Sequence, residues 1–309
     1  MSGKGFEWFR RFGKTGLTTS CLAIGGGAGI SSADVLYAFD QGIRTFFFSS
    51  DLHHFAYAAM APALRQLCGR GSSHRDEVTL INVTYIRHPR KLLGVLYDIW
   101  GELQLETVDV LMWGWMDIGD EASLTSLLRG RSTVVGPESN ATQFISASFG
   151  PGERLKQGGA IRNLGASFHD IPLARFFCHE PELDVAMVRL NVAHRRATTM
   201  LFPDLPPAPE RPGIMTFKTM ASGLGELWVK PPGWSLDWQP TPADLYRFPL
   251  SHPEVDVVLT GPRNRAEIDQ SIAAAQKGPL SEEEFALFVA WGDAHRKHLG
   301  PRAPATAGP

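Results

Sequence analysis

Short apolar runs alternate along the chain with segments whose apolar residues recur at helical spacing. Several runs are rich in β-branched or aromatic residues, as is typical of strands buried on both faces. The runs that we expect to form strands are residues 21–25, 45–49, 78–85, 108–113, 161–167, 185–190, 213–217 and 255–260. Eight strands in alternation with helices predict an α/β protein whose parallel sheet closes into a (β/α)8 barrel. An open, doubly wound sheet is the alternative.

The helical patterns and the segments between them predict one domain. Residues 57–67 predict a helix that is interrupted or offset by Pro62, and residues 90–103 predict another. Residues 281–284 begin a last helix that ends near 299. The chain has 309 residues, and a single barrel needs about 250. We therefore expect one barrel over residues 1–299, with a Gly/Ser/Thr-rich inserted loop at 129–152 that is a candidate lid. The Pro/Ala/Gly segment 300–309 is expected to be a disordered tail.

Composition narrows the classes of partner. The formal net charge is −2 and the pI is about 6.6, which gives no reason to expect nucleic acid or an anionic membrane. No apolar stretch reaches the roughly 18 residues that span a bilayer. The three cysteines lack CxxC spacing, which indicates a reduced, cytoplasmic protein. A small-molecule substrate is expected, and the sequence does not predict an oligomeric state.

Several segments, in their order and spacing, carry a resemblance to a known family. They are residues 11–17 (RFGKTGL), 42–46 (GIRTF), 108–112 (VDVLM), 159–167 (GAIRNLGAS), 188–191 (VRLN), 213–223 (GIMTFKTMASG) and 257–264 (VVLTGPRN). Through them the chain resembles the aldo-keto reductase superfamily over about residues 12–299. The resemblance implies a (β/α)8 barrel that passes hydride from a nicotinamide cofactor to a carbonyl, assisted by an Asp, a Tyr, a Lys and a His at the strand ends.

The four catalytic positions implied by this resemblance hold other residues. Phe47 stands at the Asp, Leu52 at the Tyr and Gly114 at the His, while Thr84 and Tyr85 stand where the Lys is expected. In the family, the Lys lowers the pKa of the Tyr, which protonates the carbonyl oxygen as hydride arrives. Phenylalanine and leucine side chains neither hold nor donate a proton. We therefore expect a degenerate tetrad without ordinary carbonyl reduction.

The cofactor site that the resemblance implies is partly retained. Phe168 and Met187 replace an Asn and a Gln on the nicotinamide amide, and Glu267 stands near the adenosine end. The candidate cofactor-binding residues are Ser167, Phe217, Gly223, Gly261, Arg263 and Asn264. Phe217 offers a surface for ring stacking, and the glycines suit a phosphate-binding backbone. NAD(P)H is thus a possible cofactor at an eroded site, and the cofactor is left unknown.

Ionisable side chains at the predicted strand ends are the candidates for catalysis. Asp51 and His53 follow the second strand, Tyr85 ends the third, and His169 follows the fifth. Such groups serve as general acids and bases. The alternatives are histidines in solvent-facing loops and a Tyr that packs the barrel top. Asp170 is expected to cap the helix that follows rather than to orient His169.

Aromatic residues at the same face suggest a pocket for an apolar or planar ligand. The pocket candidates are Phe47, Trp113, Trp115 and Phe168, with Arg189 to bind a carboxylate or phosphate, although a surface ion pair is equally consistent for Arg189. No histidine shows metal-ligand spacing, so no metal site is expected.

Three functions remain open from the sequence. The first is non-redox acid–base chemistry (dehydration, cyclisation or isomerisation) on a small organic substrate of the kind found in specialised metabolism. The second is an NAD(P)H-dependent oxidoreductase with substitute proton donors. The third is a non-catalytic binding protein that keeps the barrel as a scaffold.

Overall fold

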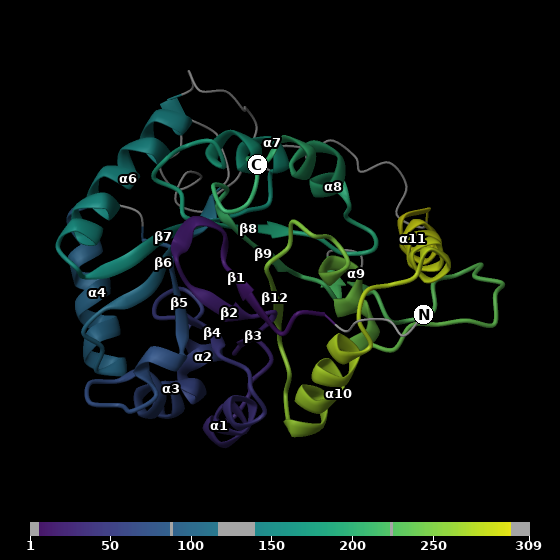
Figure 1. The fold of residues 1–309 in the computed structure, drawn as a ribbon, viewed down its shortest axis with the longest axis horizontal. Coiled ribbons are helices and arrows are strands. Elements are labelled where there is room, and N and C mark those ends of the chain that lie inside the picture. Colours follow the sequence, from purple (N-terminus) through teal and green to yellow (C-terminus); the bar gives the residue numbers. More distant parts are fainter. Residues whose placement is uncertain (1–5, 87–88, 117–139, 223–224, 298–309) are drawn as a thin grey trace, which may run out of the picture.

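Eight parallel strands form a closed barrel in the computed structural model, which describes residues 6–86, 89–116, 140–222 and 225–297 (Figure 1). Around the barrel the strand order is β12-β3-β4-β5-β6-β7-β8-β9. Their bounds are β3 (Leu22–Gly25), β4 (Thr45–Ser49), β5 (Thr79–Thr84), β6 (Val108–Met116), β7 (Ile161–Phe168), β8 (Val185–Arg189), β9 (Gly213–Phe217) and β12 (Val257–Thr260). The predicted (β/α)8 fold is confirmed, and barrel closure excludes the open sheet.

Helices surround the barrel and connect its strands (Figure 1). The longer ones are α1 (Ser32–Asp40), α3 (Ala61–Cys68), α4 (Pro89–Leu103), α6 (Asn140–Gln157), α7 (Ile171–Phe177), α10 (Arg265–Gln276) and α11 (Glu282–Lys297). Shorter elements are α2 (His54–Tyr57), α8 (Arg196–Met200), α9 (Arg247–Leu250), and the antiparallel pairs β1 (Phe9–Arg11) with β2 (Thr18–Ser20) and β10 (Ala221–Ser222) with β11 (Gly225–Glu226). No helix in the described ranges is long and apolar enough to cross a bilayer.

One expected segment is confirmed and another differs from the structure. The helix predicted over 57–67 is interrupted as expected: α2 ends at Tyr57, and α3 begins at Ala61 with Pro62 in its first turn, where a missing N–H costs nothing. Residues 140–152 of the expected inserted loop form the first part of α6, which connects β6 to β7. The rest of that segment and the tail at 300–309 lie outside the described residues.

The barrel wall separates two apolar layers. Strand residues alternate between the two faces of the sheet, so Phe47 points into the barrel while Phe46 and Phe48 pack against the helices. The inner layer consists of Phe12, Ala23, Phe47, Ile81, Val83, Val110, Met112, Val185, Met187, Met215, Phe217 and Val257. It fills the barrel below the carboxyl ends of the strands.

Three buried aspartates hold the amino-terminal ends of the strands together. Asp109, Asp184 and Asp256 lie at the start of β6, β8 and β12, and each accepts a backbone N–H from a neighbouring strand. The accepted N–H groups are those of Leu80, Leu164 and Ile214, at 2.9, 2.9 and 2.8 Å. Each carboxylate is also paired with a cation, namely Arg75, Lys156 and Arg211 respectively. This repeated arrangement stabilises the face of the barrel opposite the strand carboxyl ends.

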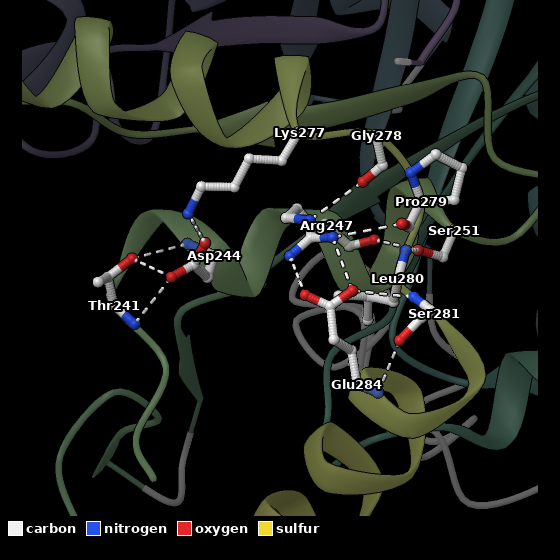
Figure 2. Close-up of polar contacts among 10 residues, drawn as sticks. All are labelled: Thr241, Asp244, Arg247, Ser251, Lys277, Gly278, Pro279, Leu280, Ser281 and Glu284. Atoms are coloured by element: carbon white, nitrogen blue, oxygen red, sulfur yellow. Dashed lines mark hydrogen bonds and ion pairs between the residues drawn. The ribbon is translucent and has the colours of Figure 1, made fainter. Parts of the chain in front are cut away.

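Arg247 of α9 binds both the connection between α10 and α11 and the first turn of α11. Its buried guanidinium donates to both carboxylate oxygens of Glu284, at 2.7 and 2.9 Å, and to the carbonyls of Gly278 and Pro279 (Figure 2). Glu284 also accepts the backbone N–H of Ser281, whose hydroxyl accepts that of Glu284, which completes a capping box. The predicted cap of the last helix thus also anchors it.

Candidate active site

Polar and aromatic side chains follow the inner apolar layer at the carboxyl ends of the strands, which we call the barrel mouth. Strand alternation from Phe47, Val83 and Met112 identifies the inward positions nearest the mouth. On β7, Gly165 faces the barrel interior, because a Cβ there would contact Val110 and Met112. The inward positions at the mouth are Ser49, Tyr85, Gly114, Ser167, His169, Arg189 and Phe217. Enzymes with this fold place their chemistry at this face.

Asp51 links the ends of two strands. Its Oδ2 accepts the Thr84 hydroxyl at 2.7 Å and the Tyr85 backbone N–H at 2.9 Å, and its Oδ1 accepts the Leu52 N–H at 2.5 Å. Both carboxylate oxygens are therefore engaged within the protein. This geometry favours a structural role for Asp51 over the expected role as a general base.

Tyr85 fills the space above Gly114. A Cβ on Gly114 would lie 2.6 Å from two carbons of the Tyr85 ring, so only glycine leaves room for the ring. His53 packs edge-on against the same ring, with centroids 5.1 Å apart. The structure therefore brings two of the predicted catalytic residues together. By contrast, His54 turns away, and its Nε2 lies 2.6 Å from Glu102 of α4.

Tyr57 is a second phenol at the mouth that the sequence reasoning missed. It ends α2, and its ring centroid lies 6.1 Å from that of Phe47. A Cβ on Gly26 would lie 2.9 Å from its ring, and a Cβ on Gly27 4.0 Å from its hydroxyl. The sequence signal was the glycine run after the first strand, which leaves space for a large neighbour, but Tyr57 was placed in a predicted helix and given no role at the site.

Burial raises the pKa of both phenols further above neutral pH. It raises the pKa of Tyr57 to about 12. The pKa of Tyr85 is raised further, first by burial and then by the nearby Tyr57 and Asp51. Both side chains therefore act as hydrogen-bond donors at neutral pH.

His169 is oriented by Arg189. The Arg189 Nη2 donates to His169 Nδ1 at 2.5 Å, so the proton of the neutral imidazole resides on Nε2. Burial, followed by the charges of Lys218 and Arg189, lowers the pKa of His169 to about 3. Its ring stands edge-on to Phe217, with centroids 5.1 Å apart. His169 is thus a neutral donor at the mouth. Asp170 accepts the Leu173 N–H at 2.9 Å, which confirms its predicted capping role.

Comparison with solved structures identifies the architecture. The holo form of AKR11C1, an aldo-keto reductase from Bacillus halodurans, superposes with a TM-score of 0.67 at 17% identity, over 92% of this chain and 95% of that chain. PA4992 from Pseudomonas aeruginosa, a proposed aldo-keto reductase, gives a TM-score of 0.58 at 16% identity, over 89% and 97%. The fold is that of the aldo-keto reductases. A scan against family models and a search of curated proteins gave no match.

Two of the predicted pocket residues do not reach the mouth of this aldo-keto reductase fold. Trp113 and Phe168 are buried in the outer layer, and Phe168 stacks on Phe177 of α7. The prediction that they line a pocket is wrong, because strand alternation turns them toward the helices. Phe47 faces inward, and the side chain of Trp115 lies outside the described part of the structure.

The predicted cofactor residues of this fold divide into two groups. Ser167 and Phe217 hold inward positions near the mouth. At the start of α10, Arg263 pairs with Glu267 at 2.6 Å, and Asn264 caps the helix through the Glu267 N–H. Gly261 follows β12, and Gly223 lies outside the described residues. Within the described ranges, no three His, Cys, Asp or Glu side chains form a metal-ligating cluster.

Proposed function

We propose that the chain is a divergent member of the aldo-keto reductase superfamily that carries out non-redox acid–base chemistry on a small organic carbonyl compound. Dehydration, cyclisation and isomerisation are the reaction types that fit. The observation that carries the proposal is the grouping of acid–base side chains at the mouth: Tyr85 lies over Gly114 with His53 packed on its ring, and Arg189 orients His169.

Hydride transfer to a carbonyl is completed by a proton donor, and in the aldo-keto reductase family this donor is a phenol whose pKa a neighbouring cation lowers. Here burial is the main cause that raises the pKa of Tyr85, and the nearby Tyr57 phenol and Asp51 carboxylate raise it further. Such a phenol keeps its proton and donates a hydrogen bond to an oxygen that becomes negative. The Nε2–H of His169 can do the same. These donors suit an enolate or alkoxide intermediate, which needs stabilisation by preorganised donors.

Proton abstraction from carbon also requires a base. His53 packs on Tyr85 and is the candidate, because imidazole is the commonest general base in enzymes. In the proposed mechanism, His53 takes a proton from the carbon next to the carbonyl while Tyr85 donates to the carbonyl oxygen. His53 then returns the proton to a different position or to a leaving group.

Exchange of carbon-bound hydrogen for deuterium tests this function without knowledge of the natural substrate. Ketones and 2-oxo acids incubated with the protein in D₂O should exchange the protons beside the carbonyl, without any nicotinamide, as followed by proton NMR. Tyr85→Phe and His53→Gln should each slow exchange by about tenfold to a thousandfold. Tyr37→Phe is the matched control, because the Tyr37 hydroxyl pairs with Asp269 on the surface. Equal exchange rates in the unsubstituted protein and in all three variants would contradict the proposal.

An NAD(P)H-dependent oxidoreductase is the second candidate, and the inward positions of Ser167 and Phe217 favour it. The internal pairing of Arg263 and Asn264 with Glu267 opposes it, because both side chains would have to leave their partner to bind an adenosine phosphate. Calorimetric titration with NADPH and NADH separates the two candidates. We expect no saturable binding at millimolar cofactor. Micromolar binding together with cofactor-driven reduction of aldehydes would establish the oxidoreductase instead.

A further inference from the structure

Lys218 has a strained backbone at the barrel mouth. It follows β9 directly, and its φ is +57°, in the left-handed region that residues other than glycine rarely adopt. For such a residue this conformation is strained, because the Cβ approaches the following carbonyl oxygen. The buried Asn191 maintains it by donating from Nδ2 to the Lys218 carbonyl at 2.8 Å. Strain of this kind concentrates at functional sites, where the surrounding structure holds a side chain in position.

Asn191 is itself firmly held. Its Oδ1 accepts the backbone N–H groups of Ala193, at 3.0 Å, and His194, at 2.8 Å. The side chain is completely buried. The support under Lys218 is therefore rigid, and the position of its side chain follows from the fold.

The surroundings of Lys218 favour its neutral amine. The Nζ lies 5.8 Å from the centroid of the Phe217 ring. Partial burial, followed by the charge of Arg189, lowers the pKa of Lys218. The same lysine acts on His169, whose pKa it helps to lower. Part of the side chain remains exposed, so a ligand in the mouth can reach it.

We propose that Lys218 is a nucleophile that forms a Schiff base with an aldehyde or ketone at the barrel mouth. The inference rests on the proposed function, because both place a carbonyl substrate against the carboxyl ends of the strands. A lysine amine beside another cation and an apolar surface is a known route to such a nucleophile. The inference adds covalent catalysis by a named residue to the carbonyl chemistry already proposed for this site.

The condensation is balanced without any further reagent. The lone pair of the neutral Nζ attacks the carbonyl carbon, a C–N bond forms, and the carbonyl π electrons move to oxygen, which takes up a proton. The nitrogen loses a proton to give a neutral carbinolamine, whose hydroxyl takes up one proton from solvent and leaves as water to give a C=N⁺ iminium. Overall, a carbonyl, a neutral lysine amine and one proton give an iminium and one water. The iminium acidifies the neighbouring C–H, as dehydration and isomerisation require.

His169 and Arg189 fit this step. The Nε2–H of the neutral His169 is a hydrogen-bond donor for the carbonyl oxygen as charge develops there. The positive charge of Arg189 disfavours a second charge on Lys218, and this keeps the amine reactive. The other interpretation of Lys218 is a cation that only packs on Phe217 or binds an anionic group.

Reductive trapping distinguishes the two interpretations. The full-length protein is treated with butyraldehyde and sodium cyanoborohydride at neutral pH, and the alkylation rate of each lysine is measured by peptide mass spectrometry. We expect Lys218 to react at least about fivefold faster than Lys230, an exposed lysine. The advantage should shrink as the pH rises toward 10.5, where ordinary lysines also lose their proton.

Substitution at Arg189 tests the cause. Arg189→Gln should slow trapping of Lys218 and move its pH midpoint upward, whereas Arg189→Lys should retain both. Alkylation of Lys218 at the rate and pH midpoint of Lys230 would overturn the inference, and so would insensitivity to Arg189→Gln. Trapping requires no turnover, so it separates this inference from the proposed function. If the protein catalyses no deuterium exchange but Lys218 is still hyper-reactive, only the proposed function is rejected. If exchange persists in Lys218→Arg, only the nucleophilic role of Lys218 is rejected.

Discussion

At the scale of single residues, the protonation of the mouth depends on neighbours from different strands. The clearest case is His169 on the β7 side, which accepts a hydrogen bond from Arg189 of β8 and lies within the field of Lys218 after β9. Two cations and burial all disfavour the imidazolium form. The same residue in a solvated loop would be an ordinary histidine, whereas here it is a fixed, neutral donor.

This burial predicts a pH dependence of stability. An unfolded histidine takes up a proton below about pH 6.5, whereas folded His169 does so only near pH 3. Between these values the unfolded state binds more protons, so the free energy of unfolding should fall as the pH falls from 6.5. His169→Gln should weaken this fall, which urea denaturation at about pH 7 and at about pH 5 would measure. An identical fall in both proteins would contradict the assignment. An NMR titration that shows the His169 ring protonated at pH 5 would contradict it as well.

At the scale of elements, the contact between β5 and β6 determines what the mouth contains. Tyr85 leaves the end of β5 and lies over Gly114 of β6, while Asp51 joins the end of β4 to that of β5. Gly114 stands where the family resemblance implies a histidine, and the absence of a side chain there leaves the space that the Tyr85 ring fills. The replacement of the histidine and the position of Tyr85 therefore depend on each other.

The contact predicts an unfavourable interaction when a methyl group is added. Gly114→Ala should lower the free energy of unfolding by about 1–3 kcal/mol, because the new Cβ would overlap the Tyr85 ring. In a Tyr85→Ala background the same substitution should cost much less, which a double-mutant cycle by urea denaturation would show. Gly101→Ala is the matched control, because no atom lies within 4 Å of a Cβ there and a helical alanine stabilises. Additive effects of the two mouth substitutions would show that the ring moves aside.

At the scale of the whole molecule, the two ends of the barrel have different tasks. The amino-terminal end is held by buried carboxylates, each of which bonds to a neighbouring strand and to a cation, as in the pair between Asp256 and Arg211. Both residues of this pair are almost completely buried. The mouth, by contrast, gathers strain at Lys218 and donors at His169. Separation of stability from chemistry is general in barrels of this kind.

The buried pair predicts a large loss of stability when it is broken. Arg211→Ala should lower the free energy of unfolding by about 3–5 kcal/mol, because the Asp256 carboxylate would be left buried without its partner. Replacing both residues with leucine should recover much of that loss. Arg70→Ala, which breaks a pair with Glu106 on the surface, should change stability by less than about 1 kcal/mol. Guanidinium denaturation of the four proteins measures these differences. Equal losses for the single and the double replacement would contradict the desolvation argument.

The sequence alone determined the fold. The period of the apolar residues is a local property, and eight strand patterns in alternation with helices leave few ways to bury their apolar faces. Local chemistry also sufficed for helix caps, such as Asp170 before α7, since a cap acts over three residues. The predictions for Trp113 and Phe168 were wrong although strand alternation is a local pattern, because both side chains were expected at the mouth and instead face the helices.

Only the tertiary structure decided the composition and charge state of the mouth. Tyr57 reaches it from a short helix, and burial together with the charge of Arg189, at the end of the neighbouring strand β8, lowers the pKa of Lys218. Such properties depend on distances across the barrel and on burial, and neither is encoded in local spacing. The closed sheet brings eight strand ends together, and that closure turns scattered polar residues into one site.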